Sequence, residues 1–151
     1  MVQPMQIPVF QEMFPKLTSP DQLAKWLKKN IKFEEDKFLF GKDDYWQSPE
    51  EFLAHKAGDC EDYALFSQSI LKKLGIESYV VSFYGRNGYA HTVLIYQDRD
   101  GYNVLNQDKL KRYHASTIEE ALSKVYPRWT WGGVAEARNK RGWLIFSLTN
   151  N

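Results

Sequence analysis

The sequence has little of what marks several large classes of protein. It contains one cysteine in 151 residues, so it has neither an internal disulfide framework nor a cysteine-rich zinc pattern. No apolar run approaches the roughly 20 residues that span a bilayer. Lys and Arg total 20 against 19 Asp and Glu, a net charge of +1. We therefore expect no membrane span and no nucleic-acid partner.

The first ten residues lack both a basic segment and a long apolar segment, which a secretory signal would need. We therefore expect a cytoplasmic protein, although secretion after removal of a signal would leave the same sequence. Hydrophobic residues make up 43% of the chain and aromatic residues 15%, which is typical of a folded globular protein. No repeat or linker interrupts it, so residues 1–151 are predicted to form one domain; the oligomeric state is left open.

Three N-capping patterns predict helices. Ser19 and Ser48 are each followed by proline and by a Gln or Glu three residues on, and Asp59 precedes a helix that should end at Gly75. After Gly75 the pattern becomes typical of strands and turns. We predict strands over 76–84, 89–96 and 102–106, a short helix from 117, and a hairpin of 129–137 with 142–148. This is an α+β fold, with N-terminal helices packed on one face of an antiparallel β-sheet.

Cys60 lies at the predicted start of the third helix. Unpaired N–H groups and a partial positive charge at such a position favour the thiolate, so we interpret Cys60 as a nucleophile. A structural cysteine would more naturally lie within an apolar run. The acids around it, Asp59, Glu61 and Asp62, are explained by the helix start, since a calcium site would need a spaced ligand loop. We expect no metal and no cofactor.

A thiol nucleophile needs a base, and the base needs a third group to orient it. His91 is the best candidate base: alternation puts it on one strand face with Val93 and Ile95, which we expect to meet the helix that carries Cys60. Pairing about the Gly101 turn places Asn106 opposite His91. A slip of two residues would place Asp108 there instead.

Acyl transfer also needs donors for the developing oxyanion. The backbone N–H of Cys60 is one candidate. The second is the indole of Trp46 or the side-chain amide of Gln47, although a core or lid position explains Trp46 equally well.

Several segments together resemble the transglutaminase-like superfamily, most closely its bacterial branch, the transglutaminase-like cysteine proteinases. They are residues 46–52, 58–64, 74–76, 90–93 and 104–106, and the resemblance covers roughly 20–110. It implies a papain-like core in which a helix bearing the cysteine packs on a sheet bearing the histidine and an acid. By position it implies Cys60 as nucleophile, His91 as base and Asn106 as third member, where the family usually has aspartate.

The leading hypothesis is an acyl-transfer enzyme that works through a thioester, most simply a cysteine protease or amidase acting on a protein or peptide. An amine acceptor in place of water would make it a transglutaminase. The alternative is a non-catalytic protein-binding module that retains the fold. A cell-wall peptidase is disfavoured by the Trp46 and Ser48 context. The enzymatic hypothesis predicts that pairing with His91 lowers the pKa of the Cys60 thiol well below that of free cysteine.

Overall fold

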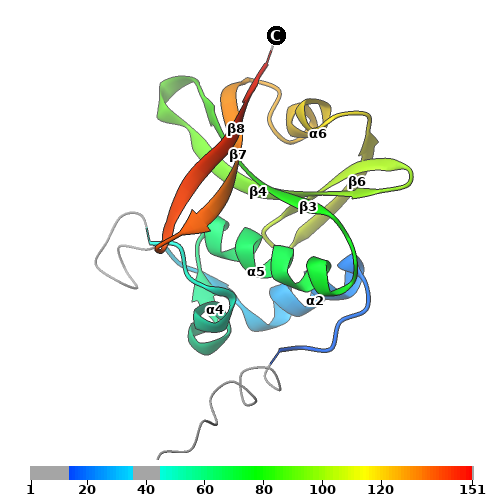
Figure 1. Cartoon of the computed structure of the whole chain (residues 1–151), viewed down its shortest axis with the longest axis vertical. Coiled ribbons are helices and arrows are strands. Elements are labelled where there is room, and N and C mark those ends of the chain that lie inside the picture. The colour runs from blue at the N-terminus through cyan, green and yellow to red at the C-terminus, as the bar shows by residue number, and fades with distance from the viewer. Residues whose placement is uncertain (1–13, 36–44, 151) are drawn as a thin grey trace, which may run out of the picture.

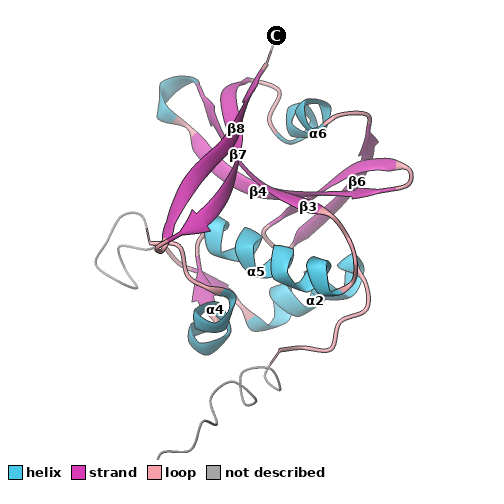
Figure 2. Cartoon of the chain, viewed as in Figure 1, coloured by secondary structure: helices cyan, strands magenta, loops and turns pink. Residues whose placement is uncertain are grey.

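The structure is a computed structural model and describes residues 14–35 and 45–150. Figures 1 and 2 show an α+β fold in which helices pack on a twisted sheet. The helices are α2 (Pro20–Asn30), α4 (Pro49–His55), α5 (Cys60–Lys73) and α6 (Ile118–Val125). The sheet has the order β6-β5-β4-β3-β7-β8, and every neighbouring pair is antiparallel. Its strands are β3 (Ser78–Gly85), β4 (Ala90–Asp98), β5 (Gly101–Asn106), β6 (Lys109–Ala115), β7 (Trp129–Arg138) and β8 (Arg141–Thr149).

The three predicted N-caps are confirmed. Ser19 accepts a hydrogen bond from the backbone of Gln22, and both Ser48 and Asp59 form reciprocal capping boxes with the residue three positions on. Gly75 follows α5 with a φ of +76°, the left-handed conformation that ends a helix. The start of α5, and therefore the position of Cys60, follows from these local rules.

The predicted α+β fold, with N-terminal helices on one face of an antiparallel sheet, is confirmed, and a further helix packs on the opposite face. Helices α2, α4 and α5 cover one face, where Leu94 and Tyr96 of β4 join their core. Helix α6 covers the other face, where Val93 and Ile95 join a second core. The predicted assignment of Val93 and Ile95 to the α5 side is therefore wrong. Alternation identifies which residues share a face, but not which layer that face meets.

Two small strand features were not predicted. β6 contains Lys109, Lys111 and Arg112, and such charged residues do not give the alternating apolar pattern from which a strand is predicted. As an edge strand it benefits from such charges, which discourage pairing with other chains. A short parallel pair also forms between β1 (Lys32–Phe33) and β2 (Ala57–Gly58), just before Cys60.

Within the described ranges, no helix is long and apolar enough to cross a membrane.

The C-terminal hairpin of β7 and β8 was predicted and is present. It is fastened to the segment before α4, because the backbone N–H of Trp46 donates to the carbonyl of Lys140 at 2.8 Å. The Lys140 ammonium also contacts Glu51 of α4 at 2.7 Å. These bonds bring the last strand of the sheet next to the N-terminal end of α5.

Candidate active site

Cys60 is the first residue of α5, and the chain that leads to it is tightly fixed. Glu34 donates its backbone N–H to the carbonyl of Gly58 at 2.7 Å. A Cβ on Gly58 would lie 2.8 Å from side-chain atoms of Asp62 and Gln47, so only glycine fits there without displacement. Cys60 is therefore held at the junction of α5 with the short β1–β2 pair.

The surroundings of Cys60 favour the protonated thiol over the thiolate. Sγ of Cys60 donates to Oε2 of Glu61 at 3.1 Å. Burial raises the pKa of the Cys60 thiol well above its usual value, and the charge and hydrogen bond of Glu61 and the charge of Asp59 raise it further. The predicted low pKa is therefore wrong for the free protein: desolvation and two nearby carboxylates outweigh the helix N-terminus.

His91 and Asn106 are joined by a hydrogen bond. Nε2 of His91 lies 2.8 Å from Oδ1 of Asn106. The β4–β5 ladder pairs Leu94 with Leu105, a register shifted by two residues from the predicted one. Asn106 nevertheless reaches the imidazole with its side chain from beyond the last pair of that ladder. His91 also packs edge-on against Phe83 of the second core, with ring centroids 5.8 Å apart, as its alternation with Val93 and Ile95 requires. Near the start of β4 it nevertheless borders the pocket of Cys60 as well.

Asp108 was the alternative partner for His91. It lies in the turn between β5 and β6, after Gln107, which has a φ of +56°. The charge of Asp108 adds to burial in raising the pKa of Tyr63 on α5 to about 12. The hydrogen bond of the imidazole goes to Asn106, so Asn106 occupies the position expected of a third member.

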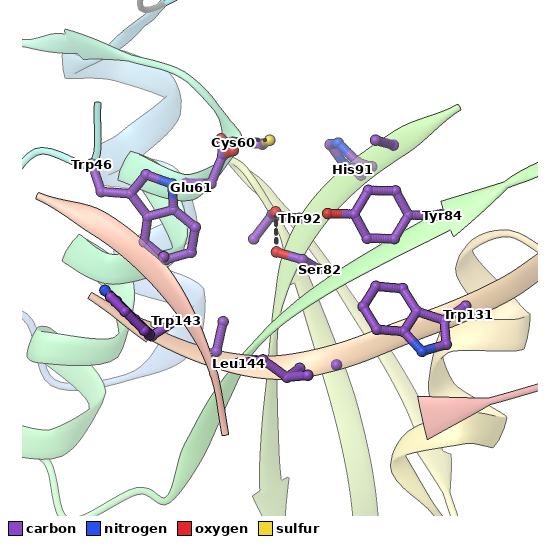
Figure 3. A pocket seen from close by; sticks show the side chains of 14 residues that line it. Trp46, Cys60, Glu61, Ser82, Tyr84, His91, Thr92, Trp131, Trp143 and Leu144 are labelled. Atoms are coloured by element: carbon purple, nitrogen blue, oxygen red, sulfur yellow. Dashed lines mark hydrogen bonds between the residues drawn. The ribbon is translucent and has the colours of Figure 1, made fainter. Parts of the chain in front are cut away.

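Cys60 and His91 line one pocket of about 270 Å³. Figure 3 shows the sulfur of Cys60 and the imidazole of His91 directed toward one another at its upper side. At its base, the hydroxyls of Ser82 and Thr92 form a hydrogen bond of 2.7 Å. The remaining wall is mostly aromatic and apolar, with side chains of Trp46, Tyr84, Trp131, Trp143 and Leu144.

The two candidate oxyanion donors have different environments. Trp46 lines the pocket, and Figure 3 shows its indole nitrogen on the side of the ring nearer Glu61 and Cys60. Gln47 is fully buried, and its Nε2 donates to the carbonyl of Ala57 at 2.8 Å and to Asp62 at 3.0 Å. The amide hydrogens of Gln47 thus bond to Ala57 of β2 and Asp62 of α5, so the expectation that it donates into the site is wrong.

The acids beside Cys60 each have a separate partner. Asp59 caps α5, Glu61 accepts from the thiol, and Asp62 accepts from Gln47. Among the described residues, the group whose potential ligand atoms lie within 4.8 Å of one another is Asp98, Asp100 and His114. It lies at the β4–β5 turn, where Asp98 already accepts backbone hydrogen bonds from Asp100 and Gly101. Those bonds explain Asp98 as a turn residue.

Comparison with known proteins agrees with this architecture. The family model described as "Transglutaminase-like domain" matches residues 16–126. The chain belongs to the transglutaminase-like domain family. A comparison with curated proteins gave no match. Among solved structures, Legionella pneumophila LapG is similar, with a TM-score of 0.53 and 19% identity over 91% of this chain and 75% of that one. Its calcium-bound form gives a TM-score of 0.51 and 20% identity, over the same shares of the two chains.

Part of this transglutaminase-like pocket comes from outside the residues that the family model matches. Trp131, Trp143 and Leu144 belong to the β7–β8 hairpin, beyond residue 126. Sequence reasoning did not assign them to the site, because hairpin residues far along the chain give no signal of which pocket they border. The role of Glu61 was also missed. Its position next to the only cysteine was the available signal.

Proposed function

We propose that this transglutaminase-like domain is an acyl-transfer enzyme, most simply a cysteine peptidase or amidase that acts on proteins or peptides. The observation that carries the proposal is that Cys60 and His91 border one pocket while Asn106 holds the imidazole from behind. Cys60 acts as nucleophile, His91 as base and Asn106 as the orienting group. These residues come from α5, β4 and β5, so only the folded chain brings them together.

The hydrogen bond to Asn106 supports a specific tautomer. Oδ1 of Asn106 only accepts, so Nε2 of His91 must carry a hydrogen. In the neutral ring Nδ1 then has a free lone pair and is the atom available to take the thiol proton. Asparagine serves in this role in other cysteine–histidine sites.

The reaction begins when the thiol proton moves from Sγ to Nδ1 of His91. Sγ attacks the substrate carbonyl carbon and forms a C–S bond, and the carbonyl electron pair moves onto the oxygen. When the tetrahedral intermediate collapses, the C–N bond breaks and His91 gives its proton to the departing amine. Water, activated by the same imidazole, then cleaves the thioester and releases an acid. An amine in place of water would give a new amide.

The developing oxyanion needs hydrogen-bond donors in the pocket. The backbone N–H of Cys60 belongs to the first turn of α5, where N–H groups have no partner within the helix. The Trp46 indole supplies the second donor in this proposal, consistent with its place on the pocket wall. Loss of one such donor costs other enzymes roughly 10²–10³ in turnover.

The test is turnover that depends on Cys60. Purified protein is incubated with a proteome-derived peptide mixture, and new peptide termini are counted by mass spectrometry. We expect cleavage by the wild type, and none by Cys60→Ala or His91→Ala that is folded by circular dichroism. A fluorescent primary amine in a parallel reaction distinguishes transamidation from hydrolysis. Equal product with wild type and Cys60→Ala would refute the proposal.

One observation favours the second candidate, a non-catalytic protein-binding module. The raised pKa of the Cys60 thiol keeps it protonated and weakly nucleophilic in the free protein. The two candidates make different predictions once substrate is present. An enzyme accumulates a thioester on Cys60 when a good acyl donor is added, which intact-protein mass spectrometry detects as an added acyl mass. A binding module retains the donor reversibly and gains no mass.

A further inference from the structure

A second hollow lies between α5 and the β7–β8 hairpin. Its volume is about 880 Å³, within the roughly 300–1,000 Å³ typical of ligand pockets. Leu65, Gln68 and Ser69 of α5 form one wall, and Val134 and Ile145 of the hairpin form part of the other. We call this hollow the helix–hairpin cleft.

The cleft adjoins the pocket that holds Cys60. Trp46 and Ala135 line both hollows, so one side chain and one strand position separate them. A polypeptide whose scissile amide lies beside Cys60 therefore has a second concave surface next to it. A small acyl donor would fill only the pocket.

A β-bulge in β8 places two consecutive side chains of that strand in the two different hollows. Val134 pairs with Phe146 and Ala135 with Leu144, so Ile145 is an extra residue in the ladder. In a regular strand, Leu144 and Ile145 would face opposite sides. Here Leu144 lines the pocket and Ile145 lines the cleft, and α5 contributes to both hollows. Leu144 and Ile145 are each about half exposed, at 53% and 52%.

Most charged side chains around the cleft have partners, and Lys72 of α5 is an exposed cation in its lining. Lys140 contacts Glu51, Arg138 contacts Glu136, and Glu77 accepts from the hydroxyl of Tyr79. Leu65, Ile76 and Ile145 offer apolar surface between these groups. The occupant that fits is therefore an apolar stretch of polypeptide.

We infer that the helix–hairpin cleft binds an extended apolar segment of the substrate polypeptide, next to the bond that Cys60 attacks. This inference rests on the proposed function for the identity of its occupant, because the cleft opens beside the thiol. It assigns substrate selection to the hairpin, in particular to Ile145 on the bulge.

The test selects linear random 12-residue peptides on phage against the Cys60→Ala protein and measures binding of the synthetic winners. We expect apolar sequences, bound at least tenfold more weakly by Ile145→Glu in the same background. Phe146→Glu is the matched control. Phe146 is the next residue of β8 and is 45% exposed, but it lines neither hollow, so binding should be unchanged. Ser69→Arg tests the opposite wall and should also weaken binding tenfold.

The outcomes separate this inference from the proposed function. If no peptide is selected, or if Phe146→Glu weakens binding as much as Ile145→Glu, the cleft is not the binding site. If wild-type protein is a dimer in sedimentation and Ile145→Glu is a monomer, the cleft is a self-association surface and the inference fails. Peptides that bind through the cleft but are never cleaved by wild type would support the cleft and refute the enzyme. If the protein cleaves peptides and neither Ile145→Glu nor Ser69→Arg changes the rate of cleavage, the proposed enzyme is supported and the cleft is refuted as a substrate site.

Discussion

Glu61 adds to burial in keeping the Cys60 thiol protonated in the free protein. It accepts the hydrogen of Sγ, and its charge is one of the causes that raise the pKa of Cys60. Replacement of Glu61 by glutamine removes that charge and should lower the thiol pKa. We expect Glu61→Gln to be alkylated by iodoacetamide several-fold faster at pH 8, with its rate profile moved to lower pH. Glu119→Gln, an exposed acid on α6, is the control. Coincident profiles for wild type and Glu61→Gln would show that Glu61 does not hold the proton.

Asn106 determines which nitrogen of His91 is free. Asn106→Ala removes the acceptor for Nε2, so the imidazole loses its fixed orientation. We expect kcat to fall at least roughly tenfold, because an incorrect tautomer costs other triads up to about 10⁴. Asn106→Asp should retain most activity, since a carboxylate also accepts from Nε2. Asp108→Ala should have the kcat of wild type. If Asp108→Ala lost more kcat than Asn106→Ala, Asp108 and not Asn106 would be the residue that orients His91.

Sequence reasoning succeeded at single residues where short-range rules apply. The cap at Asp59 puts Cys60 first in its helix, and a turn at Gly101 brings Asn106 back toward His91. It failed on the pKa of the thiol and on Gln47. Both depend on what the rest of the chain packs around them, which no local pattern specifies.

At the scale of elements, the contact between β8 and the segment before α4 shapes the pocket. Gly142 of β8 lies so close to the Trp46 ring that an added Cβ would come within 2.2 Å of it. We expect Gly142→Ala to displace the indole and to lower both kcat and the melting temperature. Tryptophan fluorescence should report the displaced ring, and Ser147→Ala on the same strand is the control. An unchanged emission spectrum and full activity would contradict this role for Gly142.

The elements that were predicted have strong local signals, and those that were missed do not. Caps predicted α2, α4 and α5, with proline in the first two, and the turn residues 139–142 predicted the last hairpin. β6 is charged because it is an edge strand, and β1 and β2 span two residues each. The bulge at Ile145 arises from pairing with β7 and cannot be found from the sequence of β8 alone.

For the whole molecule, the buried thiol makes the free energy of unfolding depend on pH in the alkaline range. An unfolded thiol titrates near pH 8.5, whereas burial raises the pKa of Cys60 in the folded protein. Above about pH 8.5 the unfolded state loses a proton that the folded state keeps, so rising pH favours unfolding. We expect the free energy of unfolding in urea to fall between pH 8 and 9.5, and Cys60 to contribute a slope of at most about 1.4 kcal/mol per pH unit.

Cys60→Ser is the comparison for that titration, because a serine hydroxyl does not ionise in this range. Its stability should fall less steeply than that of wild type from pH 8 to 9.5. The tyrosines with a raised pKa titrate near pH 10 when unfolded, so they lower the stability of both proteins toward pH 9.5. The contribution of Cys60 is therefore the difference between the two slopes. Parallel slopes for Cys60→Ser and wild type would show that another group is responsible.

The wall of Trp143 and Leu144 has a consequence for biosynthesis. A ribosome releases its product N-terminus first, so the cysteine and histidine emerge while the final hairpin is still being translated. A nascent chain at that stage has its thiol and imidazole but not the surface that completes their pocket. The proposed site is therefore complete only after translation has passed residue 144, so the order of synthesis would delay any reaction of the thiol until the domain can fold.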